Sequence, residues 1–125
     1  MVNKNFERIE RTISGFSEII NSQSVNKKAY NDKLGLITGD IEFEDESELS
    51  FMELKDTEQQ EKKKYKYHYM DKNKDLNFRY DNAKHHPEIE THPHHKHTPS
   101  GIVPSEEPEI GDVLTEIEGN IKKKD

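Results

Sequence analysis

Residues 65–81 read "YKYHYMDKNKDLNFRYD", and this stretch decides the fold. Apolar or aromatic side chains alternate with polar ones in two runs, and the residues between the runs are typical of turns. An alternation with a period of two indicates a β-strand that is buried on one face only. The stretch therefore predicts an antiparallel hairpin with one aromatic, buried face and one basic, solvated face.

The length of the turn sets the register of this hairpin. If both aromatic runs share a face, a loop at 72–75 satisfies the alternation. The next register allowed has a loop that is two residues longer. The shorter loop predicts four cross-strand pairs, namely Tyr69 with Phe78 and Tyr67 with Tyr80 on the aromatic face, and His68 with Arg79 and Lys66 with Asp81 on the basic face. We interpret the last of these as an ordinary cross-strand charge pair.

The rest of the chain supplies more strands and two helices. Alternating runs around 41–43 and 49–51 precede the hairpin, and residues 25–31 are a candidate for one further strand. Apolar residues spaced by three and four predict one amphipathic helix over 4–21 and a second over about 110–121. The two stripes are Phe6, Ile9, Ile13, Phe16 and Ile20, and Ile110, Val113, Leu114, Ile117 and Ile121. We therefore expect an α+β fold, with an antiparallel four- to five-stranded sheet and an N-terminal and a C-terminal helix on one face.

Composition limits the class of protein. A chain of 125 residues suits one domain, which we place at 1–121, with 122–125 as a disordered tail. The absence of cysteine excludes disulfides, cysteine-ligated zinc and thiol catalysis. We find no signal peptide and no apolar run of membrane-spanning length, so a cytoplasmic protein is expected. The net charge is −7, but residues 62–97 hold nine Lys or Arg and five Asp or Glu. This segment therefore carries +4 and the rest of the chain −11. A locally positive surface suits a phosphate-bearing ligand.

Histidine is concentrated in one segment. Residues 85–97 read "HHPEIETHPHHKH" and hold six of the seven histidines, the other being His68. Prolines recur through 85–104, which excludes the interior of a helix there. The histidines therefore lie on a long connection before the C-terminal helix, with a short edge strand at 94–98 as an option. Loops of such length in a compact domain are usually functional or disordered.

Two segments resemble a known family. "YKYHYMDKNKDLNFRYDNAKHHPEIETHPHHKH" and "PSEEPEIGDVLTEI" together resemble the TumE family of small toxins from toxin–antitoxin pairs, over Tyr65 to Ile117. The shared features are a tyrosine-rich strand with histidine, a hairpin, Phe-Arg-Tyr-Asp-Asn-Ala, His-His-Pro-Glu and Pro-His-His-Lys-His. Lys84 stands where the family usually has proline and His92 where it usually has an aromatic residue, so the resemblance gives His92 no role. It implies a helix-turn-helix antitoxin as partner, and an action on RNA or translation.

A metal is one possible reason for so many histidines. His94, His95 and His97, with His85 and His86, could give three or four nitrogens to zinc, nickel or copper. However, Lys96 lies inside the cluster, and adjacent histidines of an extended chain point to opposite sides. We therefore expect no cofactor and no metal ligands, and keep zinc or nickel as the alternative.

Metal-independent cleavage of RNA is the second possibility. Attack of a ribose 2′-OH on the adjacent phosphate needs a base, an acid and positive charge, which imidazoles and Lys or Arg can supply. We expect an acid–base pair of His95 or His97 with His85 or His86. The candidate catalytic residues are His85, His86, His94, His95, His97 and Glu88, the last as a residue that orients an imidazole. The candidate RNA-binding residues are Lys66, His68, Arg79 and Lys96.

Binding without catalysis is the third possibility. The histidine loop could be a structural clasp, in which imidazoles bond backbone carbonyls, or the basic strip could hold RNA or a partner protein. The sequence favours the ribonuclease toxin, with a non-catalytic protein that binds nucleic acid or a partner as the alternative. It does not indicate the RNA target or the oligomeric state.

Overall fold

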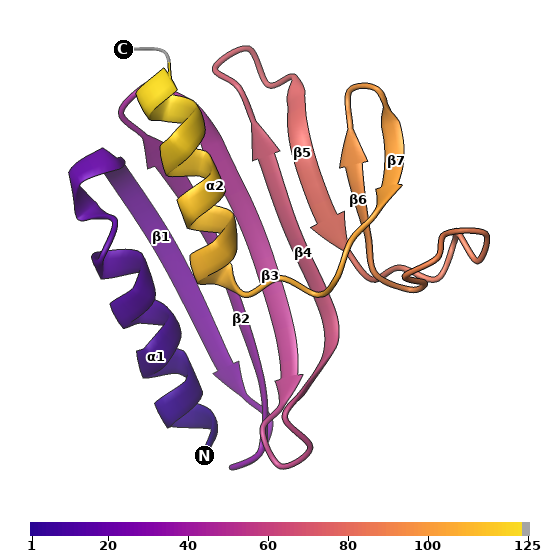
Figure 1. Cartoon of the computed structure of the whole chain (residues 1–125). Helices are drawn as coiled ribbons and strands as arrows, with labels where there is room; N and C mark the ends of the chain where they lie inside the picture. The colour runs from indigo at the N-terminus through magenta and orange to yellow at the C-terminus, as the bar shows by residue number, and fades with distance from the viewer. Residues whose placement is uncertain (124–125) are drawn as a thin grey trace.

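The computed structural model describes residues 1–123, which form one antiparallel sheet with two α-helices on one of its faces (Figure 1). The strands are β1 (Ile20–Ala29), β2 (Leu34–Phe43), β3 (Glu48–Asp56), β4 (Glu61–Met70), β5 (Leu76–Asp81), β6 (His95–Thr98) and β7 (Gly101–Pro104). The helices are α1 (Val2–Ser14) and α2 (Ile110–Lys123), and a short 3₁₀ turn, η1, covers Ser17–Ile19. The predicted α+β fold with a helix at each end is confirmed.

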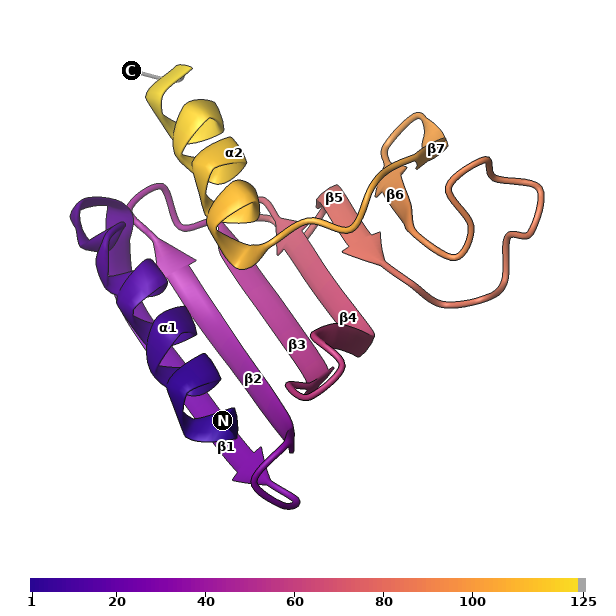
Figure 2. The ribbon, with the colours of Figure 1, turned by 60° about the horizontal axis from the view of Figure 1, so that its bottom comes forward.

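The strands follow one another across the sheet in chain order, from β1 to β7. Both helices lie on the same side of the sheet, with α1 nearest β1 and β2 and α2 further toward its middle (Figures 1 and 2). The β6–β7 hairpin extends the sheet beyond both helices, and the loop that precedes it projects from this end (Figure 2). Within residues 1–123, no helix covers the opposite face of the sheet.

The predicted number of strands is wrong, because the sheet has seven and not four or five. β1 is longer than the candidate at 25–31, and its side chains are mostly exposed because it is an edge strand, so it lacks a clear apolar alternation. β6 falls within the optional edge strand at 94–98. β7 was missed, since it has four residues and ends in proline, which is tolerated at an edge.

The predicted helix over 4–21 is too long. α1 ends at Ser14, and the backbone N–H of Gly15 donates to the carbonyls of Arg11 and Thr12. Phe16 and Ile20 belong to the turn and to β1, yet both pack against the core. The spacing of three and four persists past the helix because the 3₁₀ turn also directs these side chains inward. At the other end α2 continues to Lys123, into the segment predicted as a tail, and 124–125 lie outside the described residues.

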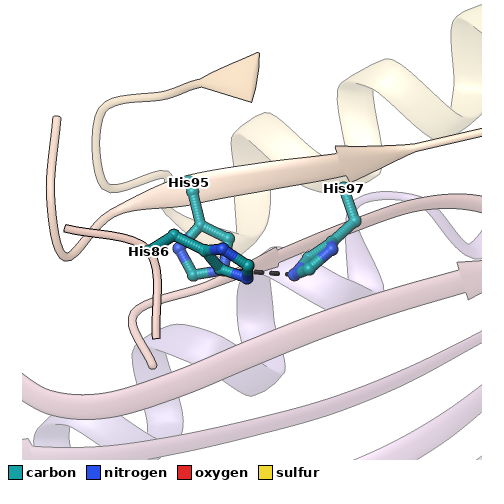
Figure 3. Close-up of side chains that lie close together, drawn as sticks. All are labelled: His86, His95 and His97. Carbon is teal, nitrogen blue, oxygen red and sulfur yellow. Dashed lines mark hydrogen bonds between the residues drawn. The ribbon is translucent and has the colours of Figure 1, made fainter. Parts of the chain in front are cut away.

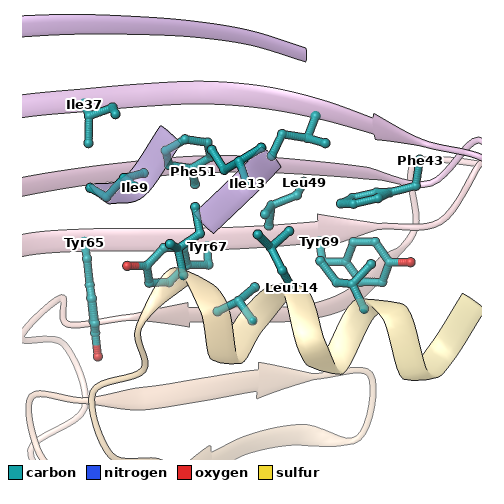
Figure 4. Close-up of a cluster of buried hydrophobic side chains, with 14 of the residues drawn as sticks. Ile9, Ile13, Ile37, Phe43, Leu49, Phe51, Tyr65, Tyr67, Tyr69 and Leu114 are labelled. Atoms are coloured by element: carbon teal, nitrogen blue, oxygen red, sulfur yellow. The ribbon is translucent and has the colours of Figure 1, made fainter. Parts of the chain in front are cut away.

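The register predicted for the tyrosine hairpin is confirmed. Tyr69 pairs with Phe78, Tyr67 with Tyr80, His68 with Arg79 and Lys66 with Asp81. A bulge then pairs Met70 with Leu76, so the connection is one residue longer than predicted. The three strand tyrosines are 1% exposed or less and pack with the isoleucines of α1 and with Leu114 of α2 (Figure 4).

Close packing of α1 on the sheet depends on Gly35. A Cβ at this position would lie 2.2 Å from Cγ2 of Val2 and 2.7 Å from the ring of Phe6, distances too short for atoms that are not bonded. The absence of a side chain therefore lets the helix approach β2.

Within residues 1–123, no helix combines the length and apolar character needed to cross a membrane.

Candidate functional site

The path of the chain brings the two histidine motifs together at the edge of the sheet. β5 ends at Asp81, the chain makes a long loop, and β6 returns from His95 beside β5. Arg79 then faces His97 across the strands, and Asp81 faces His95. Because alternate residues of a strand share a face, these four side chains lie on the open face of the sheet, with Lys66 and His68 of β4.

His86, from the loop, completes a cluster of three imidazoles on this face, which we call the histidine cluster (His86, His95 and His97; Figure 3). The ring centroids are 4.8 Å apart for His95 and His97, 5.2 Å for His86 and His95, and 5.9 Å for His86 and His97. The side chain of His95 is 2% exposed, whereas those of His86 and His97 are each 29% exposed. A ligand can therefore reach the outer two rings.

Asp81 lies directly beside the cluster. Its Oδ1 is 2.9 Å from Nε2 of His95, and its Oδ2 is 3.4 Å from Nε2 of His97. The same carboxylate accepts hydrogen bonds from the backbone N–H of Ala83 and from Nε of Arg79. Asp81 is 3% exposed, so its negative charge is buried between a cation and the imidazoles.

The contacts of His95 determine where protons lie. Nδ1 of His95 is 2.8 Å from the carbonyl oxygen of Pro93, which can only accept, so Nδ1 carries a proton. Nε2 is 2.9 Å from Asp81 and 3.1 Å from Nε2 of His97. A neutral His95 would turn a lone pair toward these two groups. A hydrogen on Nε2 of His97 can then be donated to Nε2 of His95 or to the Asp81 carboxylate.

Burial affects the acid–base properties of two histidines on this face. It lowers the pKa of His97, an effect that the neighbouring Asp81 carboxylate partly opposes. It also lowers the pKa of His68, and the positive charges of Arg79 and Lys66 lower that pKa further. Nδ1 of His68 is buried and has no hydrogen-bond partner within residues 1–123. Both rings therefore favour the neutral form near pH 7.

The structure separates the remaining predicted site residues. His85 is exposed, and Nδ1 of His94 is 2.9 Å from the hydroxyl of Tyr65, whose side chain belongs to the aromatic face. Lys96 lies on the helix-covered face, where Nζ donates to Glu116 of α2 and lies over the rings of Phe78 and Tyr80. None of these three contributes to the histidine cluster.

Glu88 lies beside His86, with Oε1 3.3 Å from Nδ1 of that ring. A hydrogen bond from its own backbone N–H is the main cause that lowers the pKa of this exposed carboxyl, and His86 acts in the same direction. The predicted role of Glu88, to orient an imidazole, is compatible with this contact.

A cavity of about 160 Å³ opens on the same face next to the cluster. Arg79 and Asp81 line it together with Met52 and two lysines of β4, Lys64 and Lys66. The cavity is therefore adjacent to the imidazoles and bordered by positive charge. An extended polyanion could follow this border toward the histidine cluster.

Asp81 is the central residue that the sequence analysis did not assign to the site. It was interpreted only as the cross-strand partner of Lys66. The signal that could have revealed it is the register itself. Extending the alternation of β5 to the optional edge strand at 94–98 places Asp81 on the same face as His95 and His97.

Fold and site together define a small α+β protein with a histidine–aspartate cluster on the open face of its sheet, beside basic residues. The family model described as "Toxin TumE" matches residues 5–122. The chain therefore belongs to the TumE toxin family, and membership of a toxin family implies an antitoxin partner. No curated protein and no solved structure matches it.

Proposed function

We propose that this protein is the toxin of a toxin–antitoxin pair and that it cleaves RNA without a metal, using histidines as general base and general acid. The observation that carries the proposal is the convergence of His86, His95 and His97 with a buried aspartate, next to Arg79 and the basic residues of β4. The partner would be a helix-turn-helix antitoxin, as the family resemblance implies, and the substrate would be RNA.

His97 is the best placed base. Its ring is accessible, and an Nε2–H donated to Asp81 or His95 would hold the ring in one orientation and leave the lone pair on Nδ1. The lowered pKa of His97 keeps the ring neutral near pH 7, as a base requires. His97 would take the proton of the ribose 2′-OH as its oxygen bonds to phosphorus.

His86 is the best placed acid. It lies on the accessible side of the cluster, and the adjacent Glu88 carboxylate, 3.3 Å from Nδ1, can hold the ring in place. His86 would give its proton to the 5′ oxygen as the bond between that oxygen and phosphorus breaks. The products are a 2′,3′-cyclic phosphate and a free 5′-hydroxyl.

Positive charge for the phosphorane would come from Arg79, whose side chain is 40% exposed. Lys66 and His68, on the neighbouring strand, would hold adjacent phosphates of the chain. His95 would act as a positioning residue, since it is buried between Pro93, Asp81 and His97.

The test is single-turnover cleavage of RNA in the presence of EDTA. His97→Ala and His86→Ala should each reduce the rate constant about 100- to 10,000-fold, the usual contribution of general acid–base catalysis. His85→Ala is the matched control, because that exposed ring lies next to His86 in sequence but outside the cluster. Circular dichroism would establish that each variant is folded.

A growth assay extends the test to the cell. The wild type should arrest growth when expressed alone, and co-expression of an antitoxin should relieve the arrest. Cleavage at the wild-type rate by both His97→Ala and His86→Ala would refute the catalytic role and support the non-catalytic alternative. The enclosed, hydrogen-bonded position of His95 is the observation that favours this alternative.

A further inference from the structure

We propose that the histidine cluster also binds one divalent transition-metal ion, such as Zn²⁺ or Ni²⁺, and that the bound ion blocks the cleavage of RNA. One ring nitrogen from each of His86, His95 and His97 lies within 4.8 Å of the other two. Imidazole nitrogen is a preferred ligand of both ions. The binding rests on geometry alone, whereas the inhibition rests on the proposed function.

The structure removes the two objections to a metal that the sequence raises. Adjacent histidines of an extended chain point apart, but the cluster uses only one histidine of the first pair, His86, and the alternate residues His95 and His97 of β6. Lys96, which lies between them in sequence, points to the other face and bonds Glu116. No lysine ammonium therefore competes with an ion at this position.

The distances suit a tetrahedral ion after a small movement. Zinc–nitrogen bonds of 2.0–2.1 Å at tetrahedral angles place two ligand nitrogens about 3.3 Å apart. Nε2 of His95 and Nε2 of His97 are already 3.1 Å apart. A separation of 4.8 Å would have to shorten by about 1.5 Å, and His86 can supply this shift because it lies on a loop rather than on a strand.

The charges also favour an ion. A proton on Nδ1 of His95 leaves Nε2 as the nitrogen that can bind a metal, and Asp81 supplies a buried negative charge 2.9 Å from it. The oxygens of Asp81 already accept bonds from Ala83 and Arg79, so we assign this carboxylate to charge balance rather than to the ligand set. An ion bound at Nε2 of His95 would therefore lie next to a buried negative charge.

Occupation by a metal excludes the proposed acid–base chemistry. A nitrogen that donates its lone pair to zinc can neither accept the proton of a 2′-OH nor carry a proton to a leaving group. The same three rings would then serve either proton transfer or metal binding, and a toxin loaded with zinc would be inactive.

Calorimetric titration of the metal-free full-length protein with ZnCl₂ tests the binding. The wild type should bind one ion, His86→Ala and His97→Ala should each bind at least 10-fold more weakly, and His85→Ala should bind like the wild type. His85→Ala is the matched control, since its ring is exposed on the same loop outside the cluster. Absence of tight binding, or equal weakening in the control, would overturn the proposal in favour of loose binding by a histidine-rich loop.

Cleavage assays on the same samples test the inhibition. The rate should fall in proportion to the fraction of protein that holds zinc and should return when EDTA is added. Cleavage that is unchanged or faster with zinc bound would overturn the inhibition. A metal-free protein that does not cleave RNA would overturn the proposed function and the inhibition together, while the result of the titration would still decide the binding.

Discussion

The two faces of the sheet each bury a charged cluster, and the two are built differently. On the helix-covered face, Nζ of Lys62 donates to the hydroxyl of Tyr67 and to the carbonyl of Pro108, and that hydroxyl donates to Oε2 of Glu53. We call Lys62, Tyr67 and Glu53 the lysine cluster. On the open face, Nε2 of His95 and Nε2 of His97 both lie beside the Asp81 carboxylate and beside each other.

The difference concerns what each cluster still needs. In the lysine cluster, each donated proton has a hydrogen-bond acceptor. Of the side-chain atoms of this cluster, only Oε1 of Glu53 lacks a partner within residues 1–123. The histidine cluster offers ring nitrogens that can exchange protons or bind an ion, and two of its rings are accessible. A cluster of the first kind stabilises the fold, and one of the second kind can perform chemistry. Substitutions should therefore separate stability from activity.

The largest loss of stability is expected for Lys62→Met. The change removes the ammonium that reaches Glu53 through the Tyr67 hydroxyl and leaves this buried carboxylate without a compensating charge, which costs about 3–5 kcal/mol in the free energy of unfolding. Urea unfolding would measure it, with the exposed neighbour Lys63→Met as matched control, expected to change stability by no more than about 0.5 kcal/mol. Cleavage per folded molecule should not change. Equal stability of the two variants would show that the lysine cluster contributes little.

Asp81→Asn should lower both stability and activity. The amide carries no negative charge and cannot balance a proton or an ion beside His95. Its weaker hydrogen bonds with Ala83 and Arg79 should lower the free energy of unfolding by about 1–3 kcal/mol. Cleavage should fall about 10- to 100-fold through misplacement of His97, as expected when an orienting partner is lost.

The exposed Asp40 on β2 offers the matched control, and Asp40→Asn should leave both quantities unchanged. Single-turnover rates and urea unfolding are measured on the same samples. If Asp81→Asn unfolds more easily but cleaves as fast as the wild type, Asp81 would belong with the lysine cluster as a purely structural residue.

The sequence predicts the middle of the fold better than its edges. Buried strands alternate strictly, so parity limits the tyrosine hairpin to loops that differ by two residues, and the shorter loop predicts the pairs from Lys66–Asp81 to Tyr69–Phe78. Edge strands bury little on either face, and for this reason β1 was only partly recognised and β7 was missed. The end of α1 was hidden because Phe16 and Ile20 continue its spacing outside the helix.

The candidate site follows the same rule. Composition located the histidines, and alternation assigned His95 and His97 to one side and Lys96 to the other. The choice of His86 over His85, and the approach of Asp81, depend on how the loop folds back and on the pairing of β5 with β6. These are tertiary contacts across a long connection, on which local periodicity has no bearing.

Stability should also fall on mild acidification. The pKa of half-buried His68 is lowered in the folded protein, mainly by burial and further by the charges of Arg79, Lys66 and His97. The unfolded chain then binds more protons, so the contribution of His68 is fully present above its unfolded pKa of about 6.5 and is lost as pH falls from there through the folded pKa. Urea unfolding at several pH values between 5 and 7.5 should therefore show lower stability at the acidic end.

His68→Gln should make this dependence on pH shallower, because glutamine does not titrate. The exposed His85→Gln is the matched control and should leave the slope as in the wild type. Some slope should remain in His68→Gln, since the pKa of His97 is also lowered. An unchanged slope in His68→Gln would show that His68 is as easily protonated in the folded protein as in the unfolded chain.

The smallest effect is expected for Lys96→Met, which tests the assignment of the two faces. Lys96 lies in the middle of the histidine motif, but its ammonium bonds Glu116 on the helix side and contacts the faces of two aromatic rings. The ion pair is partly exposed, so its loss should cost no more than about 1 kcal/mol, and cleavage and zinc binding should stay at wild-type levels. A fall in cleavage larger than 10-fold in a folded Lys96→Met would mean that this lysine reaches the substrate, and that β6 presents its other face to RNA.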